Sequence, residues 1–273
     1  MSERNATASH TAGAVFDRLA ATYDREFTDS VIGRAQRNAV WKALLKTFHP
    51  GAYLLELNCG TGEDAFFLAD NGISVFACDA SPKMIARAEQ RLQLKPSMSS
   101  IVFRHLPTER IPEIVSGQRF NGVFSNFSGL NCIADLSPVA AALSNQVNRG
   151  DKLLLCFSTR ICLIEILYYL ARNQKDKALR RTRGRTQATL NEGTLEVFYP
   201  TLSEVRRAFA PHFRLRSTIG IGVAIPPSYL EAWAHRHRFA FHLLTAIETI
   251  AAHVPLLRTT GDHMLLTFEK VTP

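Results

Sequence analysis

The sequence predicts an α/β protein built on a doubly wound sheet. Strand-like and helix-like segments alternate from residue 52 almost to the end of the chain, which is typical of this fold class. A hydrophobic strand also runs through a turn with two glycines directly into a helix at residues 54–68. The 273 residues are 46% hydrophobic and 21% charged, which is enough apolar material for one large domain.

The order of the elements follows from apolar spacing and from turn residues. Two helices precede the sheet, because apolar side chains recur at helical spacing over Phe16–Tyr23 and Val40–Phe48. Ser81 and Pro82 begin a helix that runs to about Leu92. We expect strands at Ala52–Leu57, Ile73–Cys78, Ile101–Arg104, Phe120–Ser125, Lys152–Phe157, Leu215–Ile225 and His263–Glu269, helices at Val139–Val147, Ile161–Arg180, Thr201–Phe209 and Tyr229–Ala252, and a linker at Arg183–Gly193.

Composition excludes several classes of protein. The N-terminus lacks the apolar core of a signal peptide. The longest apolar run, Ile161–Leu170, is interrupted by Glu165 and is shorter than the ~18 residues that a membrane span needs. Five cysteines without CxxC spacing favour a reducing compartment over a disulfide framework or a zinc ribbon. We therefore expect a cytoplasmic protein.

The net charge of +8 is concentrated in one segment. Thr159–Arg185 carries eight basic residues against Glu165 and Asp176, a net +6. Such a cluster suits an anionic substrate, an anionic membrane surface, or simply a solvated helix face. Nucleic acid is disfavoured, because the aromatic residues are not interleaved with the basic ones as on a stacking platform.

The turn from Leu57 to Gly62 has the layout of a ligand site. At the carboxyl end of a parallel strand, glycines let the backbone approach a ligand, and the following helix offers free N–H groups. Asp79 closes the next strand, 23 positions after Glu56, near the spacing at which an acidic side chain reaches the ribose hydroxyls of an adenosine ligand. A dinucleotide and S-adenosylmethionine are the two ligands to weigh.

The glycine spacing separates these two ligands. A dinucleotide fingerprint needs three glycines in G-x-G-x-x-G, whereas Gly60 and Gly62 are followed by Ala65. Glu56 would repel a pyrophosphate, but its charge favours the ammonium or sulfonium of S-adenosylmethionine. The turn therefore favours S-adenosylmethionine.

Four segments resemble the class I S-adenosylmethionine-dependent methyltransferases, especially the small-molecule enzymes of the ubiquinone/menaquinone-biosynthesis-like branch. They are Phe16–Asp24, Leu55–Gly62, Val75–Met84 and Phe120–Asn126, and the resemblance covers roughly residues 14–158. It implies a Rossmann-like sheet of seven strands, mostly parallel with an antiparallel last strand. It also implies S-adenosylmethionine as the cofactor.

The resemblance implies a set of cofactor-binding residues, each with a subsite. The methionine part would lie against the glycine turn, the ribose on the acidic residue after the second strand, and the adenine between the residues that follow. The implied set is Tyr23, Glu56, Asn58, Cys59, Gly60, Gly62, Asp79, Ala80, Met84, Thr108, Asn126 and Phe127.

Two of these positions depart from the family pattern. The family usually has glycine at position 58, and we expect Asn58 to preserve the turn because asparagine tolerates left-handed backbone. The acidic residue that commonly accepts from the adenine amino group is absent, since residues 106–109 read Leu-Pro-Thr-Glu. Adenine would then depend on Thr108 or on backbone groups.

We expect a single methyltransferase domain over residues 1–273. Residues 14–50 would form a helical lid, with the Tyr23 hydroxyl near the methionine end of the cofactor. Two insertions, 159–193 and 226–260, follow the carboxyl ends of parallel strands, where ligands bind in open α/β sheets, and would form the acceptor pocket. Their large apolar residues suit a small-molecule pocket and include Ile164, Leu167, Tyr168, Tyr229, Trp233 and Phe241.

The histidines contribute no metal site in this interpretation. His235, His237 and His242 do not share a helix face, and no carboxylates complete a ligand set. His263, at the start of the last strand, is a candidate general base, with a structural histidine as the alternative. No catalytic residue is assigned from the sequence.

The sequence thus predicts in-line methyl transfer from S-adenosylmethionine to a small, partly apolar acceptor, which the basic residues allow to be anionic. Two alternatives stay open: a protein that binds the cofactor without turnover, and an NAD-dependent oxidoreductase. The basic insertion also raises the hypothesis of peripheral contact with an anionic membrane surface. The acceptor, the attacked atom and the oligomeric state do not follow from the sequence.

Overall fold

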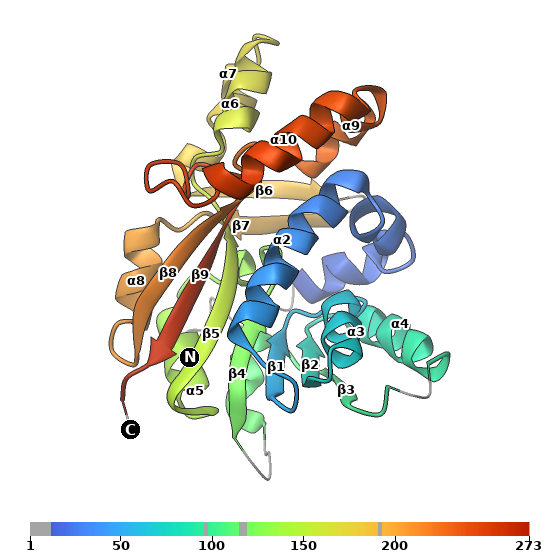
Figure 1. Ribbon diagram of the computed structural model, residues 1–273, viewed down its shortest axis with the longest axis vertical. Helices are drawn as coiled ribbons and strands as arrows, with labels where there is room; N and C mark the ends of the chain where they lie inside the picture. The colour runs from blue at the N-terminus through green and yellow to red at the C-terminus, as the bar shows by residue number, and fades with distance from the viewer. Residues whose placement is uncertain (1–11, 96–97, 115–118, 191–192, 273) are drawn as a thin grey trace.

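The computed structural model describes residues 12–95, 98–114, 119–190 and 193–272. A central seven-stranded sheet has the order β3-β2-β1-β4-β5-β9-β8 (Figure 1). The first five strands are parallel, and β9 lies antiparallel between β5 and β8, which confirms the predicted sheet. The strands are β1 Tyr53–Leu57, β2 Ser74–Asp79, β3 Ile101–His105, β4 Phe120–Ser125, β5 Val147–Ser158, β8 Phe213–Ile221 and β9 His263–Lys270.

Helices cover both faces of the sheet and enclose two apolar cores. On one face, α2 (Val31–Thr47), α3 (Glu63–Asp70) and α4 (Pro82–Gln93) pack over β1, β2 and β4. On the other face, α5 (Ser137–Ser144) and α8 (Leu202–Phe209) pack over β4, β5 and β9. After β1 the chain adds β2 and β3 on one side of that strand, and then β4 and β5 on its other side. The carboxyl ends of β1 and β4 therefore form the crevice where ligands bind in such folds.

Side-chain caps fix the helix starts that the sequence predicts. The Ser81 hydroxyl accepts from Met84 N at 3.1 Å and begins α4, with Pro82 in the first turn. Thr201 and Glu204 form the reciprocal capping box of α8. α2 begins earlier than the apolar spacing indicated, after Ser30, whose hydroxyl accepts from Gly33 N. Val40 and Leu44 of α2 and its C-cap residue Phe48 pack into the core.

The first insertion differs from its predicted structure. Ile161–Arg180 is not one helix but α6 (Leu163–Leu170) and α7 (Lys175–Ala178), because Asn173 between them has left-handed backbone with φ of 58°. The predicted linker instead contains a hairpin of β6 (Arg185–Leu190) and β7 (Gly193–Phe198). Four of the six residues of β6 are polar or charged, so the apolar alternation that signals a half-buried strand is missing.

The second insertion is also divided. The expected single helix is a short 3-10 turn, Ser228–Leu230, followed by α9 (Glu231–Arg236) and α10 (Arg238–Ala251), with non-helical backbone at His237. β8 ends at Ile221 rather than Ile225, because Gly222 turns the chain with φ of 68°.

Two carboxylates anchor this insertion to the rest of the fold. Glu248 of α10 accepts from four successive backbone N–H groups, those of residues 222–225, at 2.6–3.2 Å. Glu231 of α9 accepts from the N–H groups of Val31 and Ile32 at the start of α2.

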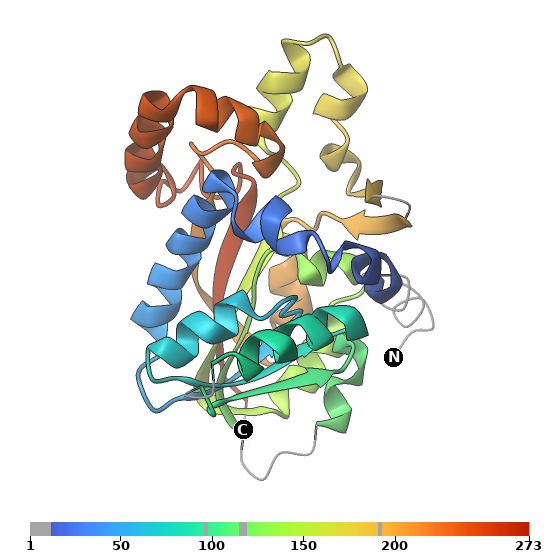
Figure 2. The same cartoon turned by 90° about the vertical axis from the view of Figure 1, so that its right-hand side faces the viewer.

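Both insertions lie at the same end of the molecule, beyond the carboxyl ends of the parallel strands (Figures 1 and 2). In the described part of the chain, no helix is both long enough and apolar enough to cross a membrane.

Candidate functional site

The turn between β1 and α3 forms the floor of the site. Asn58, Gly60 and Gly62 have φ of 57°, 54° and 82°, so the expectation that Asn58 preserves the left-handed turn is confirmed. Gly62 is also sterically required, because a Cβ there would lie 2.6 Å from the Phe103 ring. The Asn58 amide donates to Ser125 Oγ at 3.3 Å and its oxygen accepts from Thr108 Oγ at 3.1 Å.

Asp79 binds the turn to the end of β2. One carboxylate oxygen accepts from Gly60 N at 2.9 Å, and the other accepts from Ser81 N at 2.8 Å. Burial raises the pKa of the Asp79 carboxyl, although these two N–H groups oppose the rise. The carboxylate is therefore held in one orientation at the edge of a cavity.

That cavity, here called the cofactor cavity, brings together eight of the twelve implied site residues: Tyr23, Asn58, Gly60, Asp79, Ala80, Met84, Asn126 and Phe127. The remaining wall comes from the N-terminal segment, with Ala12, Gly13 and Phe16, and from Gly129, Cys132 and Ile133. The other four implied residues do not line it: Glu56, Cys59, Gly62 and Thr108. Thr108 contacts a lining residue, because its hydroxyl donates to Asn58.

Glu56 is a buried carboxyl at the end of β1. Its side chain is 1% exposed, and its Oε2 has no hydrogen-bond partner among the described residues. Burial and the nearby Asp64 carboxylate raise the pKa of Glu56, and Arg37 opposes them. Because Glu56 does not line the cofactor cavity, a bound ammonium group would satisfy this oxygen through water.

Residues 12–29 close one side of the cofactor cavity. Asp17 accepts from Ser81 Oγ at 2.5 Å and from Lys83 N at 3.0 Å, so it caps the start of α4. The Tyr23 ring lies beside Gly60, 3.7 Å from where a Cβ would stand. Thr61 Oγ donates to Asp24 at 2.5 Å, and Arg91 lies 3.9 Å from the same carboxylate. Polar contacts thus hold the segment over the turn.

We predict that this segment acts as a lid on the cofactor. Hydrogen exchange of residues 12–29 should slow when S-adenosylhomocysteine is added, because the ligand would contact Phe16 and Tyr23 and stabilise the closed segment. Helix α8, on the other face of the sheet, is the internal control and should exchange at the same rate with and without ligand. Equal exchange of residues 12–29 in both samples would contradict a lid.

A buried ion pair behind the cavity was not predicted from the sequence. Arg37 of α2 contacts Asp64 of α3, with Nη1 and Oδ1 2.7 Å apart, and both side chains are almost fully buried. Asp64 also accepts from Trp41 Nε1 at 2.6 Å and from Asn126 Nδ2 at 2.9 Å. The Arg37 guanidinium lies over the Phe127 ring, 4.8 Å from its centre. The cluster fixes the two implied residues that follow β4.

A second cavity of about 340 Å³, here called the acceptor cavity, adjoins the first. Phe16, Tyr23 and Phe127 line both cavities. The insertions contribute part of the acceptor wall, and β9 contributes its first residue, which confirms that the antiparallel strand begins at this edge of the sheet. The remaining lining residues are Leu19, Phe27, Gly33, Gln36, Arg37, Ser128, Ser158, Arg180, Arg181, Pro227, Ser228, Tyr229, Asp262 and His263.

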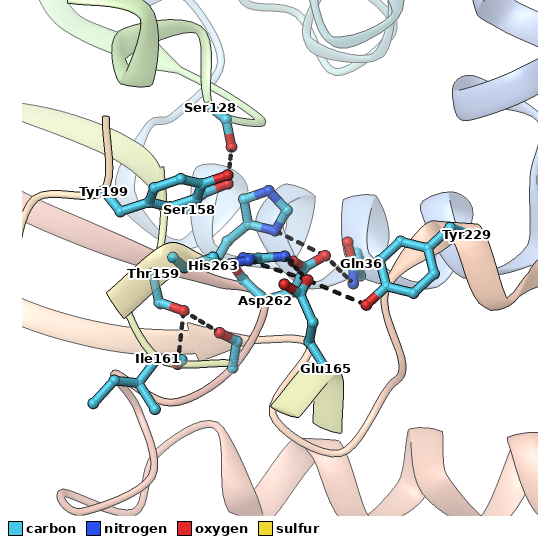
Figure 3. A network of polar contacts seen from close by, with 12 residues as sticks. Gln36, Ser128, Ser158, Thr159, Ile161, Glu165, Tyr199, Tyr229, Asp262 and His263 are labelled. Atoms are coloured by element: carbon cyan, nitrogen blue, oxygen red, sulfur yellow. Dashed lines mark hydrogen bonds and ion pairs between the residues drawn. The ribbon is translucent and has the colours of Figure 1, made fainter. Parts of the chain in front are cut away.

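A buried polar network ties the insertions to this cavity (Figure 3). Arg181 Nη2 donates to Glu165 at 2.6 Å and to Asp262 at 2.8 Å. Arg180 donates to both oxygens of Glu165, and the Tyr229 hydroxyl donates to the same carboxylate. Two residues of the basic run are therefore paired with carboxylates: Arg181 is buried, and the side chain of Arg180 is 38% exposed.

The network shifts the ionisation of its members. Burial by itself raises the pKa of Asp262, but His263 and the Arg181 guanidinium outweigh burial and hold that pKa below its usual range. Burial raises the pKa of the Tyr229 hydroxyl, and the Glu165 carboxylate adds to the rise. Asp262 is therefore an anion and Tyr229 a neutral hydrogen-bond donor at neutral pH.

The histidines set aside as metal ligands are exposed on α9, α10 and the break between them. Over the described ranges of the chain, no group of three or more His, Cys, Asp or Glu side chains is placed to hold a metal ion.

Two sequence comparisons find similarity to methyltransferases. Residues 54–150 match a family model described as a methyltransferase domain. The demethylmenaquinone methyltransferase of Beutenbergia cavernae is 30% identical over 156 residues. These residues are 55% of this chain and 59% of the relative, so the chain spans less than two thirds of that protein.

Solved structures share the fold at low sequence identity. A protein of Listeria monocytogenes described as an S-adenosylmethionine-dependent methyltransferase superposes with a TM-score of 0.59 at 14% identity, over 88% of this chain and 100% of that one. The [4+2]-cyclase SpnF superposes with a TM-score of 0.63 at 12% identity, over 97% of each chain. At these identities the structures show the fold alone.

Residues 54–150 match a methyltransferase domain, and the sheet order and the glycine turn with its Asp79 contact follow the fold of class I S-adenosylmethionine-dependent methyltransferases. S-adenosylmethionine is the cofactor of this class, and the residues present fit it: a fixed carboxylate for the ribose hydroxyls and a buried carboxyl oxygen of Glu56 that lacks a partner among the described residues.

Proposed function

We propose that this protein transfers the methyl group of S-adenosylmethionine to a small, partly apolar aromatic acceptor. The observation that carries the proposal is the pair of adjoining cavities with Phe16, Tyr23 and Phe127 as shared walls. A methyl group directed from the cofactor cavity toward these walls would face a molecule in the acceptor cavity. In-line displacement requires this arrangement.

The chain's own contribution is binding, alignment and exclusion of water. The cofactor supplies an electrophilic methyl group on a sulfonium. Asp79 and the glycine turn would hold its ribose and methionine parts, and the Arg37–Asp64 cluster would keep Phe127 in place beside the reacting atoms. The closed segment over both cavities would keep water out, and alignment of this kind supplies up to ~7–11 kcal/mol of the barrier reduction.

The wall of the acceptor cavity supports an aromatic acceptor. Phe16, Phe27, Phe127 and Tyr229 offer ring faces and edges against which a planar molecule packs. The cationic side chains that line the cavity are each paired with a carboxylate, so they leave no excess charge for an anion. An uncharged aromatic ring therefore fits better than an acidic acceptor. The name of the Beutenbergia relative, a demethylmenaquinone methyltransferase, is consistent with this chemistry.

Formation of S-adenosylhomocysteine tests the proposal directly. The purified protein is incubated with S-adenosylmethionine and reduced demethylmenaquinone, simple phenols or aromatic amines, and both products are measured by mass spectrometry. We expect acceptor-dependent S-adenosylhomocysteine and an acceptor heavier by one CH₂ unit. Cofactor binding without product from any acceptor would support the non-catalytic alternative, and binding of NAD instead of S-adenosylhomocysteine would support the oxidoreductase.

Two aromatic residues of the second insertion give a matched test of the acceptor cavity. Tyr229 lines this cavity, whereas Trp233, also a candidate from the sequence, lies outside it on α9. Tyr229→Ala should raise the acceptor KM about tenfold, because the contact of its ring with the acceptor, ~1.4 kcal/mol, is lost. Trp233→Ala should leave it unchanged. If Tyr229→Ala and Trp233→Ala have the same acceptor KM, Tyr229 of the second insertion does not contact the acceptor.

We also propose that the insertions rest on an anionic membrane surface. Large apolar side chains are exposed on both, including Leu167 on α6, Phe239 and Ile250 on α10, and Leu256 after it, at 66–86% exposure. Exposed cations lie among them at Arg172, Lys175, Lys177, Arg236 and Arg238, against the single exposed acidic residue Asp176 in these described segments. Apolar and basic side chains together favour the surface of an anionic bilayer.

Vesicle sedimentation measures this contact. The protein should sediment with vesicles of phosphatidylcholine and phosphatidylglycerol more than with phosphatidylcholine alone, and high salt should release it. Phe239→Asp with Ile250→Asp should abolish sedimentation. Leu94→Asp, an equally exposed site beyond α4, is the control. Sedimentation that is unaffected by the α10 substitutions would exclude this surface.

A further inference from the structure

His263 lies where the acceptor would meet the methyl group. It is the first residue of β9, its side chain is 11% exposed, and it lines the acceptor cavity. Its ring packs edge-on against Phe127 with the ring centres 5.5 Å apart. Phe127 lines both cavities, so the imidazole lies beside their junction.

A carboxylate lies beside one nitrogen of the imidazole. His263 Nδ1 is 3.5 Å from Asp262 Oδ2, an ion-pair distance, and makes no hydrogen bond among the described residues. Asp262 is held by Arg181 Nη2 at 2.8 Å and by Gln36 Nε2 at 3.3 Å. Figure 3 shows the other ring nitrogen on the side of the imidazole away from Asp262. A proton on Nδ1 facing the carboxylate leaves the lone pair on Nε2.

Burial keeps this histidine neutral. Burial lowers the pKa of His263, the Asp262 carboxylate opposes that, and the Arg181 guanidinium from the first insertion lowers it further. From α2, Arg37 also lines the cavity but is paired with Asp64. At neutral pH the ring is therefore an unprotonated base.

The other ionisable side chains of the cavity wall cannot take up a proton. Tyr23 and Tyr229 stay protonated, since burial raises the pKa of each hydroxyl. Arg37, Arg180 and Arg181 are cations, and Asp262 is engaged by Arg181 and Gln36. Among the described residues that line the acceptor cavity, this leaves His263 as the available base.

We propose that His263 is the general base of the reaction and that the acceptor carries an aromatic hydroxyl group. This proposal rests on the proposed function. The hydroxyl proton moves to His263 Nε2, and the electron pair so released, on the oxygen or on the adjacent ring carbon, bonds to the methyl carbon. When the ring carbon is methylated, it then loses its own hydrogen to water as a proton and the ring oxygen takes up a proton, which restores the aromatic ring. The carbon–sulfur bond breaks with its pair on sulfur, which gives S-adenosylhomocysteine. Asp262 stabilises the imidazolium until His263 releases the proton to water.

Turnover of the reduced demethylmenaquinone probe tests the role. His263→Ala should lower kcat by ~10²–10⁴-fold, the usual contribution of general base catalysis, with S-adenosylhomocysteine affinity unchanged. Added imidazole should restore part of the rate in His263→Ala, which a purely structural residue would not show. The wild-type kcat should decrease as the pH is lowered through a pKa below 6.5, where His263 takes up a proton. His263→Asn should lose this acid-side decrease in the pH profile. His253→Asn, at an exposed site, is the control.

Histidine NMR on the complex with S-adenosylhomocysteine needs no turnover. The His263 signal, assigned by its loss in His263→Asn, should show a neutral ring protonated on Nδ1 at pH 7. A charged ring or a proton on Nε2 at that pH would overturn the proposal, as would a kcat of His263→Ala within threefold of wild type. If the wild type binds S-adenosylhomocysteine but methylates none of the acceptors tested, the proposed function fails, whereas the NMR result still decides whether His263 is available as a base.

Discussion

Replacing Asp79 with alanine should weaken S-adenosylhomocysteine binding by about five- to 150-fold. The ribose hydroxyls would lose a charged hydrogen-bond acceptor, a contribution of ~1–3 kcal/mol. Titration calorimetry measures the change directly. Asp79→Asn should lose less, because its side-chain oxygen still accepts from one of the two N–H groups that now bind Asp79.

The melting temperatures of the variants without ligand distinguish an effect on folding from an effect on binding. Asp79 also satisfies Gly60 N and Ser81 N, so Asp79→Ala should melt somewhat below the wild type even without ligand. Asp70→Ala, at the end of α3 and outside the cavity, should leave affinity unchanged. If Asp79→Ala binds S-adenosylhomocysteine with wild-type affinity, the Asp79 carboxylate does not bind the ribose hydroxyls.

Replacing Arg181 with alanine should destabilise the protein by ~3–5 kcal/mol. The substitution leaves the buried carboxylates Glu165 and Asp262 without their shared cation, and an uncompensated buried charge carries a cost of this size. Urea unfolding gives the free energy. Arg183→Ala is the matched control, since its pair with Asp176 is exposed and contributes at most ~1 kcal/mol.

The pH dependence of the Arg181 effect has a definite sign. In the wild type the pKa of Asp262 is lowered, so this group stabilises the fold above its unfolded pKa and that contribution is lost as pH falls. Without Arg181 the carboxylate pKa rises, and protonation relieves the buried charge. The stability difference between wild type and Arg181→Ala should therefore narrow between pH 7 and pH 4. A constant difference would mean that the lost contacts are not electrostatic.

The sequence predicts the local parts of this structure well. The strand, the left-handed turn and the Ser81 cap each depend on residues within a few positions of one another, so pattern and turn chemistry suffice for the segment that contains Asn58 and Asp79. The resemblance to a known family adds the subsites, and eight of its implied residues line one cavity.

The parts that could not be predicted depend on contacts between distant segments. Arg37 meets Asp64 across 27 positions, and Arg181 meets Asp262 across 81. Neither pair has a local spacing signal, and a lone basic or acidic residue in a sequence is usually a solvated one. The helix breaks at Asn173 and His237 were missed because the apolar spacing continues across both.

The segment that closes the cofactor cavity has a consequence for the order of events in a catalytic cycle. Phe16 and Tyr23 form part of both cavity walls, so a single displacement of residues 12–29 would open the route for the cofactor and for the acceptor together. The two ligands would then not exchange independently. Each opening would break the contacts of Asp17 with Ser81 and of Asp24 with Thr61, so product departure and the loading of the next cofactor and acceptor would share one energy barrier.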